Sequence, residues 1–145
     1  MSDIVVDASV AVKWFVPEVH SDAARRLLQD GTDLLAPDLI WAEVGNVLWR
    51  KWRSGELAAE DACGILVSFR RMPLRMHAGE SLYDVAWPVA YALGMTFYDS
   101  LYLALALKAG CTLVTADLRL CSAVRGSQWS NHCLWVEDVC QMGDL

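Results

Sequence analysis

Four acidic residues, Asp7, Glu43, Asp99 and Asp117, stand where a folded chain would otherwise bury apolar side chains. Asp7 lies between the runs IVV and ASVAV, and Glu43 lies between LIWA and VGNVLW. Burying a carboxylate without a partner costs several kcal/mol, and a divalent cation bound by several carboxylates would remove that cost. Oxygen ligands without His or Cys favour Mg²⁺, or Mn²⁺, over Zn²⁺. We therefore expect these four acids to be metal ligands and catalytic residues.

Each acid also has a purely structural explanation. Thr96 and Asp99 form a T-x-x-D capping box before an apolar run, and Asp117 is placed to cap the helix expected after it. Asp7 fits a strand-to-helix turn, and Glu43 fits a solvent-exposed position on a helix. Taken together, however, four acids in apolar surroundings favour a shared chemical role over four separate structural ones.

Polar residues next to the acids in the sequence are candidates to orient them by hydrogen bonding. These candidates are Ser9, Asn46, Ser100 and Thr115. Ordinary helix capping is the alternative role for the serine and threonine residues.

Two further groups of residues have open roles. The basic run RKWR contains Arg50, Lys51 and Arg53, and it reads either as a solvated helix end or as a patch that steers phosphates. Lys13 and Trp14 fit either a substrate groove or the boundary of the core. The sequence alone does not choose between these roles.

Composition limits the class of protein. A length of 145 residues fits about one domain, and the net charge of −6 disfavours a protein that coats nucleic acid with a basic face. That charge still permits an enzyme whose acids hold a divalent cation against a phosphate. No apolar run reaches the ~18 residues of a membrane span, and the N-terminal MSDIVVDAS does not resemble a signal peptide. We therefore expect a cytoplasmic protein with no membrane segment.

Cysteine and histidine spacing excludes two kinds of site. The five cysteines form no CxxC pair, so we expect them to be small buried residues rather than disulfide or zinc ligands: Cys63, Cys111, Cys121, Cys133 and Cys140. The three histidines show no HExxH spacing, which leaves histidine-based metal chemistry unsupported.

Periodicity predicts alternating strands and helices, which is typical of βαβ units around a parallel sheet. Strands are expected over residues 3–8, 33–37, 73–77, 112–116 and 133–139, the last at an edge. Helices are expected over residues 21–31, 38–55, 58–72, 80–94, 98–109 and 118–124, with a kink or restart at Pro88. The prediction is a single α/β domain over residues 1–145, with a central, mostly parallel sheet flanked by helices.

This arrangement places the acids. Asp7 and Asp117 fall at the carboxyl ends of predicted strands, where open parallel sheets have their functional crevice. Glu43 lies early in the long helix, and Asp99 lies in the first turn of a helix that must run back toward the same crevice. We expect the four carboxylates to converge there.

Four segments, in order, resemble a known family: VVDASVAVKWFVPE, LLAPDLIWAEVGNVLWRK, YDSLYLALALKAG and TLVTAD. Together they resemble the PIN domain, and specifically the VapC-type toxins of type II toxin–antitoxin pairs. The resemblance covers essentially the whole chain and matches its four acids to the four acids of the family. It implies that Asp7 and Asp99 are direct Mg²⁺ ligands, and Ser9 matches a hydroxyl residue common two positions after the first acid. Leu120 departs from the pattern, since related sequences often have an aromatic residue after the fourth acid.

The resemblance implies a metal-dependent endoribonuclease that hydrolyses RNA phosphodiester bonds with Mg²⁺, or Mn²⁺. It also implies a cognate VapB-type antitoxin and a homodimer. Two alternatives remain: a catalytically silent PIN-fold module that only binds a partner, and a receiver-like phospho-acceptor domain. The receiver alternative expects paired acids after the first strand, whereas Asp7 is followed by Ala8 and Ser9. It also expects an acceptor Asp at the end of a middle strand, whereas residues 73–77 end in His77.

Overall fold

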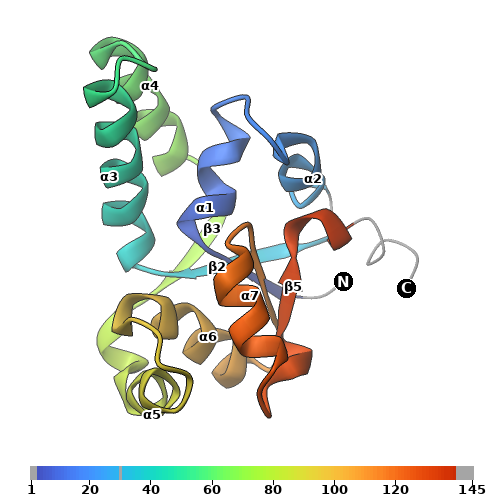
Figure 1. The fold of residues 1–145 in the computed structure, drawn as a ribbon. Helices are drawn as coiled ribbons and strands as arrows, with labels where there is room; N and C mark the ends of the chain where they lie inside the picture. Colours follow the sequence, from blue (N-terminus) through green and yellow to red (C-terminus); the bar gives the residue numbers. More distant parts are fainter. Residues whose placement is uncertain (1–2, 30, 140–145) are drawn as a thin grey trace.

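The computed structural model describes residues 3–29 and 31–139, which fold around one five-stranded sheet (Figure 1). Its strands are β1 (Asp3–Val6), β2 (Asp33–Pro37), β3 (Leu74–His77), β4 (Thr112–Thr115) and β5 (Cys133–Trp135). The spatial order is β3-β2-β1-β4-β5, and every neighbouring pair is parallel. The predicted α/β fold with a central parallel sheet is therefore confirmed.

Helices connect the strands and flank the sheet. The α-helices are α1 (Ala8–Ala11), α2 (Ser21–Arg26), α3 (Leu39–Arg53), α4 (Ala59–Arg70), α5 (Tyr83–Leu93), α6 (Phe97–Ala109) and α7 (Leu118–Arg125). Short 3₁₀ turns are η1 (Val12–Trp14), η2 (Gly79–Ser81) and η3 (Ser130–His132). In Figure 1, α1 and α2 lie above β2, and α5 and α6 lie below it.

The centre of the core is formed by β1 and α6. Strand β1 pairs with β2 on one side and β4 on the other, so that Ile4 lies between Leu34 and Thr112. Helix α6 is buried on every face from Ser100 to Ala106, as its almost wholly apolar sequence requires. Gly110 ends α6 in the left-handed conformation that favours glycine, with φ of 67°. Helix α6 therefore has a fixed position and can place its first turn accurately.

Helices α3 and α4 form a hairpin that extends away from the sheet (Figure 1). An ion-pair network attaches this hairpin to the segment after α1. Both Lys13 Nζ and Lys51 Nζ lie 3.0 Å from the carboxylate of Glu18, and Lys51 Nζ also lies 3.2 Å from Glu56 Oε2. The network fixes the far half of α3, while the near half of the helix faces the sheet.

Several predicted boundaries were wrong. Helix α2 ends at Arg26 rather than residue 31. After Arg26 the backbone hydrogen bonds span three residues instead of four, because the N–H groups of Leu27 and Leu28 donate to carbonyls three residues earlier. The last strand ends at Trp135, and residues 136–139 form a tight 3₁₀ turn instead. The sequence analysis also predicted no helix after Asp7, where α1 and η1 form.

Two local expectations had different outcomes. Helix α5 continues through Pro88 and does not restart there. The expectation of buried cysteines holds for Cys121 and Cys133, whereas Cys63 is exposed on α4. The four described cysteines are free thiols, and Cys140 lies outside the described residues.

Within the described residues, no single helix is both long enough and apolar enough to cross a bilayer. Helices α5 and α6 pass that test only as a pair, and they are bent by 119° where they meet.

Candidate active site

A cavity of about 510 Å³ lies at the carboxyl ends of β1 and β4, and all four predicted acids line it. Asp7 and Asp117 immediately follow or nearly follow these strands, Glu43 projects from α3, and Asp99 lies in the first turn of α6. Parallel strands present their carboxyl ends at one edge of the sheet, which explains why residues so distant in sequence meet here.

Asp7 is the most buried of the four acids, with 7% of its surface exposed. It caps α1, and its Oδ1 accepts hydrogen bonds from the Ser9 hydroxyl at 2.5 Å and the Val10 backbone N–H at 3.2 Å. Its Oδ2 accepts a hydrogen bond from the Thr115 hydroxyl. Burial raises the pKa of Asp7 from 3.8 to about 6. The three hydrogen bonds lower this pKa but do not outweigh burial, and the negative charge of Asp99 raises it further. The carboxylate is therefore held rigidly in a site that disfavours its charge.

Glu43 is anchored by a residue that the sequence analysis did not identify. The hydroxyl of Tyr102 donates a hydrogen bond to Glu43 Oε1 at 2.5 Å, and the tyrosine is only 1% exposed. Burial raises the pKa of Glu43, and the charge of Asp99 adds to this, while the Tyr102 bond and Arg50 oppose it. Tyr102 follows Asp99 by three positions on α6, and this i, i+3 spacing could have indicated that both side chains face the same cavity.

Asp99 lies in the first turn of α6, Asp117 is the N-cap of α7, and both also line the cavity. The backbone N–H of Asp99 donates to the Thr96 hydroxyl, which caps α6, and Asp117 caps α7 by accepting from the N–H groups of Arg119 and Leu120. Burial raises the pKa of Asp99, and the nearby charge of Asp117 raises it further. The structural and chemical explanations given above for these acids are therefore compatible.

The four polar neighbours differ in their contacts. Ser9 and Thr115 both donate to Asp7, and they also accept from the backbone N–H groups of Ala116 and Asp117, which joins the start of α1 to the end of β4. Asn46 lines the cavity. Ser100 is buried beside Asp99, but its hydroxyl donates to the Phe97 carbonyl and contacts none of the acids.

The three basic residues of the run on α3 have different contacts. Arg50 lines the cavity and its charge acts on Glu43, whereas Lys51 belongs to the ion-pair network and Arg53 lies 5.7 Å from the centre of the Trp49 ring. Lys13 and Trp14 do not line the cavity. Lys13 pairs with Glu18, and the Trp14 indole donates to the Ala24 carbonyl at 2.9 Å, so both side chains belong to the core.

The donor set of the cavity suits a hard divalent cation. Among the described residues, its ionisable lining groups are four carboxylates, Arg50 and two tyrosines, with no His or Cys. The acids also repel one another, since the charge of Asp99 raises the pKa of both Asp7 and Glu43. Such a set fits Mg²⁺ or Mn²⁺. Over residues 3–29 and 31–139, no group of three His, Cys, Asp or Glu side chains stands close enough together to form a metal site by itself.

Comparison with known proteins gives consistent relatives. The family model described as the PIN domain matches residues 4–125. The chain is 35% identical over 119 residues to ribonuclease VapC3 of Pyrobaculum aerophilum, covering 81% of this chain and 91% of that protein. It is 33% identical over 117 residues to ribonuclease VapC9 of Mycobacterium tuberculosis, covering 81% of this chain and 87% of that protein.

Solved structures agree with these relatives. The crystal structure of PAE2754 from Pyrobaculum aerophilum superposes with a TM-score of 0.71 at 25% identity, over 99% of this chain and 91% of that one. VapC20 of Mycobacterium tuberculosis, described as a toxin that cleaves the sarcin–ricin loop, superposes with a TM-score of 0.64 at 17% identity, over 83% of this chain and 94% of that one. The family match removes the receiver-domain alternative, and the expected resemblance is confirmed: the chain belongs to the PIN-domain family.

Proposed function

We propose that this protein is a metal-dependent endoribonuclease and the toxin of a VapBC-type toxin–antitoxin pair. The observation that supports this most directly is the presence of Asp7, Glu43, Asp99 and Asp117 on one cavity in a chain whose relatives are named VapC ribonucleases. A partner-binding module without catalysis would have no need to keep mutually repelling carboxylates in a half-buried site.

The four acids have different roles in metal binding in this proposal. Asp7 and Asp99 are the primary ligands of Mg²⁺ or Mn²⁺, and Glu43 and Asp117 complete the site. Three donors fix Asp7 in one orientation, and one fixes Glu43, so the binding of a cation does not require these two side chains to be ordered first. When bound, the cation supplies the Lewis acid that phosphodiester hydrolysis needs at the phosphoryl and leaving oxygens.

The partners follow from the same proposal. A VapB-type antitoxin would block the cavity, and its Arg or Lys side chains would pair with the acids in place of the cation. We further propose that the chain is a homodimer and acts in the cytoplasm, where its RNA substrate is found. Light scattering at micromolar concentration tests the proposed homodimer, because a measured mass equal to that of a monomer would contradict it.

A cleavage assay tests the proposal as a whole. Protein freed of any co-purified partner should cleave single-stranded RNA with Mg²⁺ or Mn²⁺ and lose this activity in excess EDTA. Ca²⁺, which is larger and accepts looser geometry, should bind without supporting turnover. The thermal midpoint of the protein should rise with Mg²⁺ and with Ca²⁺, which provides a measure of binding that does not depend on activity. Cleavage that persists unchanged in EDTA would refute the metal-dependent proposal.

A further inference from the structure

A second cavity, of about 340 Å³, adjoins the first and shares Asp99 and Asp117 with it. The first cavity extends from these acids toward α3, where Arg50 lines it. The second extends from the same acids toward α7, where Arg119 lines it. Because two acids line both cavities, the cavities meet at these acids, with Arg50 lining the one and Arg119 the other, and we call the two together the groove.

Arg50 and Arg119 are the two cations among the described residues that line this groove. Neither side chain forms an ion pair or a hydrogen bond with another described residue. Most other cations of the described chain are paired, including Lys13, Lys51, Arg75, Lys108 and Arg125. The charge of Arg50 acts on Glu43 without a direct bond, so the donor groups of both arginines are available to an anion in the groove.

The position of Arg119 is locally unfavourable. It lies in the first turn of α7, where the positive end of the helix dipole disfavours a cation. Residues that break a local rule in this way tend to occur where function requires them. A phosphate bound in the groove would offset this cost, since it would face both the guanidinium and the helix end.

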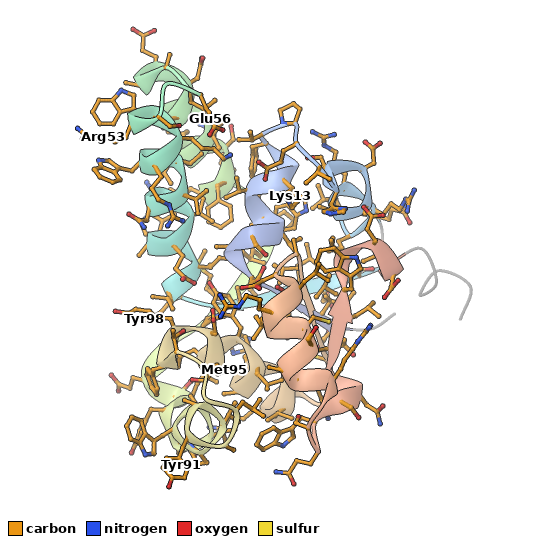
Figure 2. The ribbon with its side chains drawn as sticks, in the orientation of Figure 1. Lys13, Arg53, Glu56, Tyr91, Met95 and Tyr98 are labelled. Carbon is orange, nitrogen blue, oxygen red and sulfur yellow. The ribbon has the colours of Figure 1, made fainter. Side chains whose placement is uncertain are left out.

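An exposed aromatic ring lines the α3 side of the groove, beside the acids. Tyr98 is adjacent to Asp99, lines the first cavity and is 60% exposed. Figure 2 shows it at the start of α6, directed outward near the lower end of α3. An exposed ring next to a phosphate site is a platform on which an unpaired base can stack.

We propose that the groove binds a single RNA strand, with one backbone phosphate on Arg50, another on Arg119, and the bond to be cleaved at the acids between them. Tyr98 stacks on a base of the same strand. This inference rests on the proposed ribonuclease function and adds to it the path of the strand and the residues that hold it. The arginines also explain how a chain with a net charge of −6 brings a polyanion to an acidic site.

Binding of a fluorescein-labelled, single-stranded RNA 12-mer tests this path. Anisotropy titrations over a range of salt concentrations, with Ca²⁺ in place of Mg²⁺ to prevent turnover, compare the parent with Arg50→Gln, Arg119→Gln and Tyr98→Ala. Arg71→Gln is the matched control, because Arg71 is exposed and lines neither cavity. Its substitution changes the net charge by the same amount as the other two arginine substitutions. Thermal melting confirms that each variant is folded.

Each groove arginine variant should reduce the slope of log K against log salt concentration by about 0.7, the contribution of one phosphate on a single strand. Tyr98→Ala should weaken binding by roughly tenfold and leave the slope unchanged. The Arg71→Gln control should match the parent. The proposed path is overturned if either groove arginine variant keeps the parent slope, or if Tyr98→Ala binds like the parent.

The same preparations separate this inference from the proposed function. A parent protein that fails to cleave the 12-mer with Mg²⁺ refutes the ribonuclease itself, whatever the binding data. A parent that cleaves normally, with arginine variants whose slopes equal the control, refutes only the path of the strand.

Discussion

The hydroxyl of Tyr102 on α6 donates a hydrogen bond of 2.5 Å to Glu43 on α3, across 59 positions of sequence. This bond joins the helix at the centre of the core to the helix that extends away from the sheet. The carboxylate of Glu43 thereby takes its orientation from a fully buried part of α6.

The substitution Tyr102→Phe tests this role. It keeps the buried ring and removes only the hydrogen bond, so the fold should persist with a loss of about 1–2 kcal/mol. Because Glu43 is then no longer oriented, higher Mg²⁺ concentrations should be needed both for cleavage and for thermal stabilisation. Tyr91→Phe, on the exposed surface of α5, is the control and should leave both unchanged. An unaltered Mg²⁺ dependence in Tyr102→Phe would show that the bond is only structural.

Asp7 should make the metal-free protein less stable as the pH rises. Its pKa is 3.8 in the ordinary state and about 6 in the fold, so between these values the folded state binds more protons than the unfolded state. The stabilisation is therefore fully present below about pH 4 and is lost as the pH rises through about 6, a change of about 3 kcal/mol. Denaturation in EDTA at pH 4.5 and 7.5 measures about 2 kcal/mol of this change, because the rest of it lies below pH 4.5.

Asp7→Asn provides the control for that pH dependence. The amide retains an acceptor for Ser9 and Val10 and places a donor opposite the Thr115 hydroxyl, which can rotate to accept it. The variant should be more stable than the parent at pH 7.5 and lose this advantage at low pH. Equal differences between parent and variant at both pH values would contradict the raised pKa.

Asp99→Asn distinguishes a helix cap from a metal ligand. The hydroxyl of Thr96 caps α6 in the structure, so the substitution should cost little beyond the dipole interaction, about 0.3–1 kcal/mol. Relief of repulsion from Asp117 acts in the opposite direction, and the metal-free variant should melt at or above the parent. The parent should gain more stability from added Mg²⁺. A variant that melts lower, cleaves RNA normally and responds equally to Mg²⁺ would show that Asp99 only begins the helix.

The ion-pair network should respond unequally to removal of its members. Glu18→Gln leaves Lys13, which is 8% exposed, without its carboxylate, and should destabilise the fold by about 3 kcal/mol. Lys51→Gln leaves Glu18 paired with Lys13 and should cost about 1 kcal/mol. Urea denaturation of the two variants gives the order, and a larger loss for Lys51→Gln would reverse the assignment of Glu18 as the centre of the network.

The sequence predicted the strands and most helices because their apolar residues follow burial, which the sheet imposes most strongly on β1, β2 and β4. It predicted poorly where short-range geometry decides, as in the six-residue α2 and the turn after Trp135. The four-residue α1 was missed because its residues are buried like those of the strand before it, so no polar face marks it as a helix.

Within the site, sequence reasoning found residues whose charge is anomalous in apolar surroundings. It did not find Tyr102, because a tyrosine in a buried helix is unremarkable until its hydroxyl is seen to face a carboxylate. Nor did it choose among the basic residues of α3, since only the helical phase separates Arg50, which faces the cavity, from Lys51, which faces Glu18.

The pairing of β1 with β4 has a consequence for the synthesis of the protein. Asp7 receives a hydrogen bond from a threonine 108 positions later, and Asp117 follows that threonine by two. A nascent chain that has emerged from the ribosome only as far as α6 contains three of the four acids. It lacks β4, Asp117 and α7, which form the other side of the groove. During translation, therefore, the site assembles only after the segment containing β4 and the start of α7 has left the ribosome. Under the proposed ribonuclease function, a chain built in this order has no complete site for messenger or ribosomal RNA until that segment has emerged.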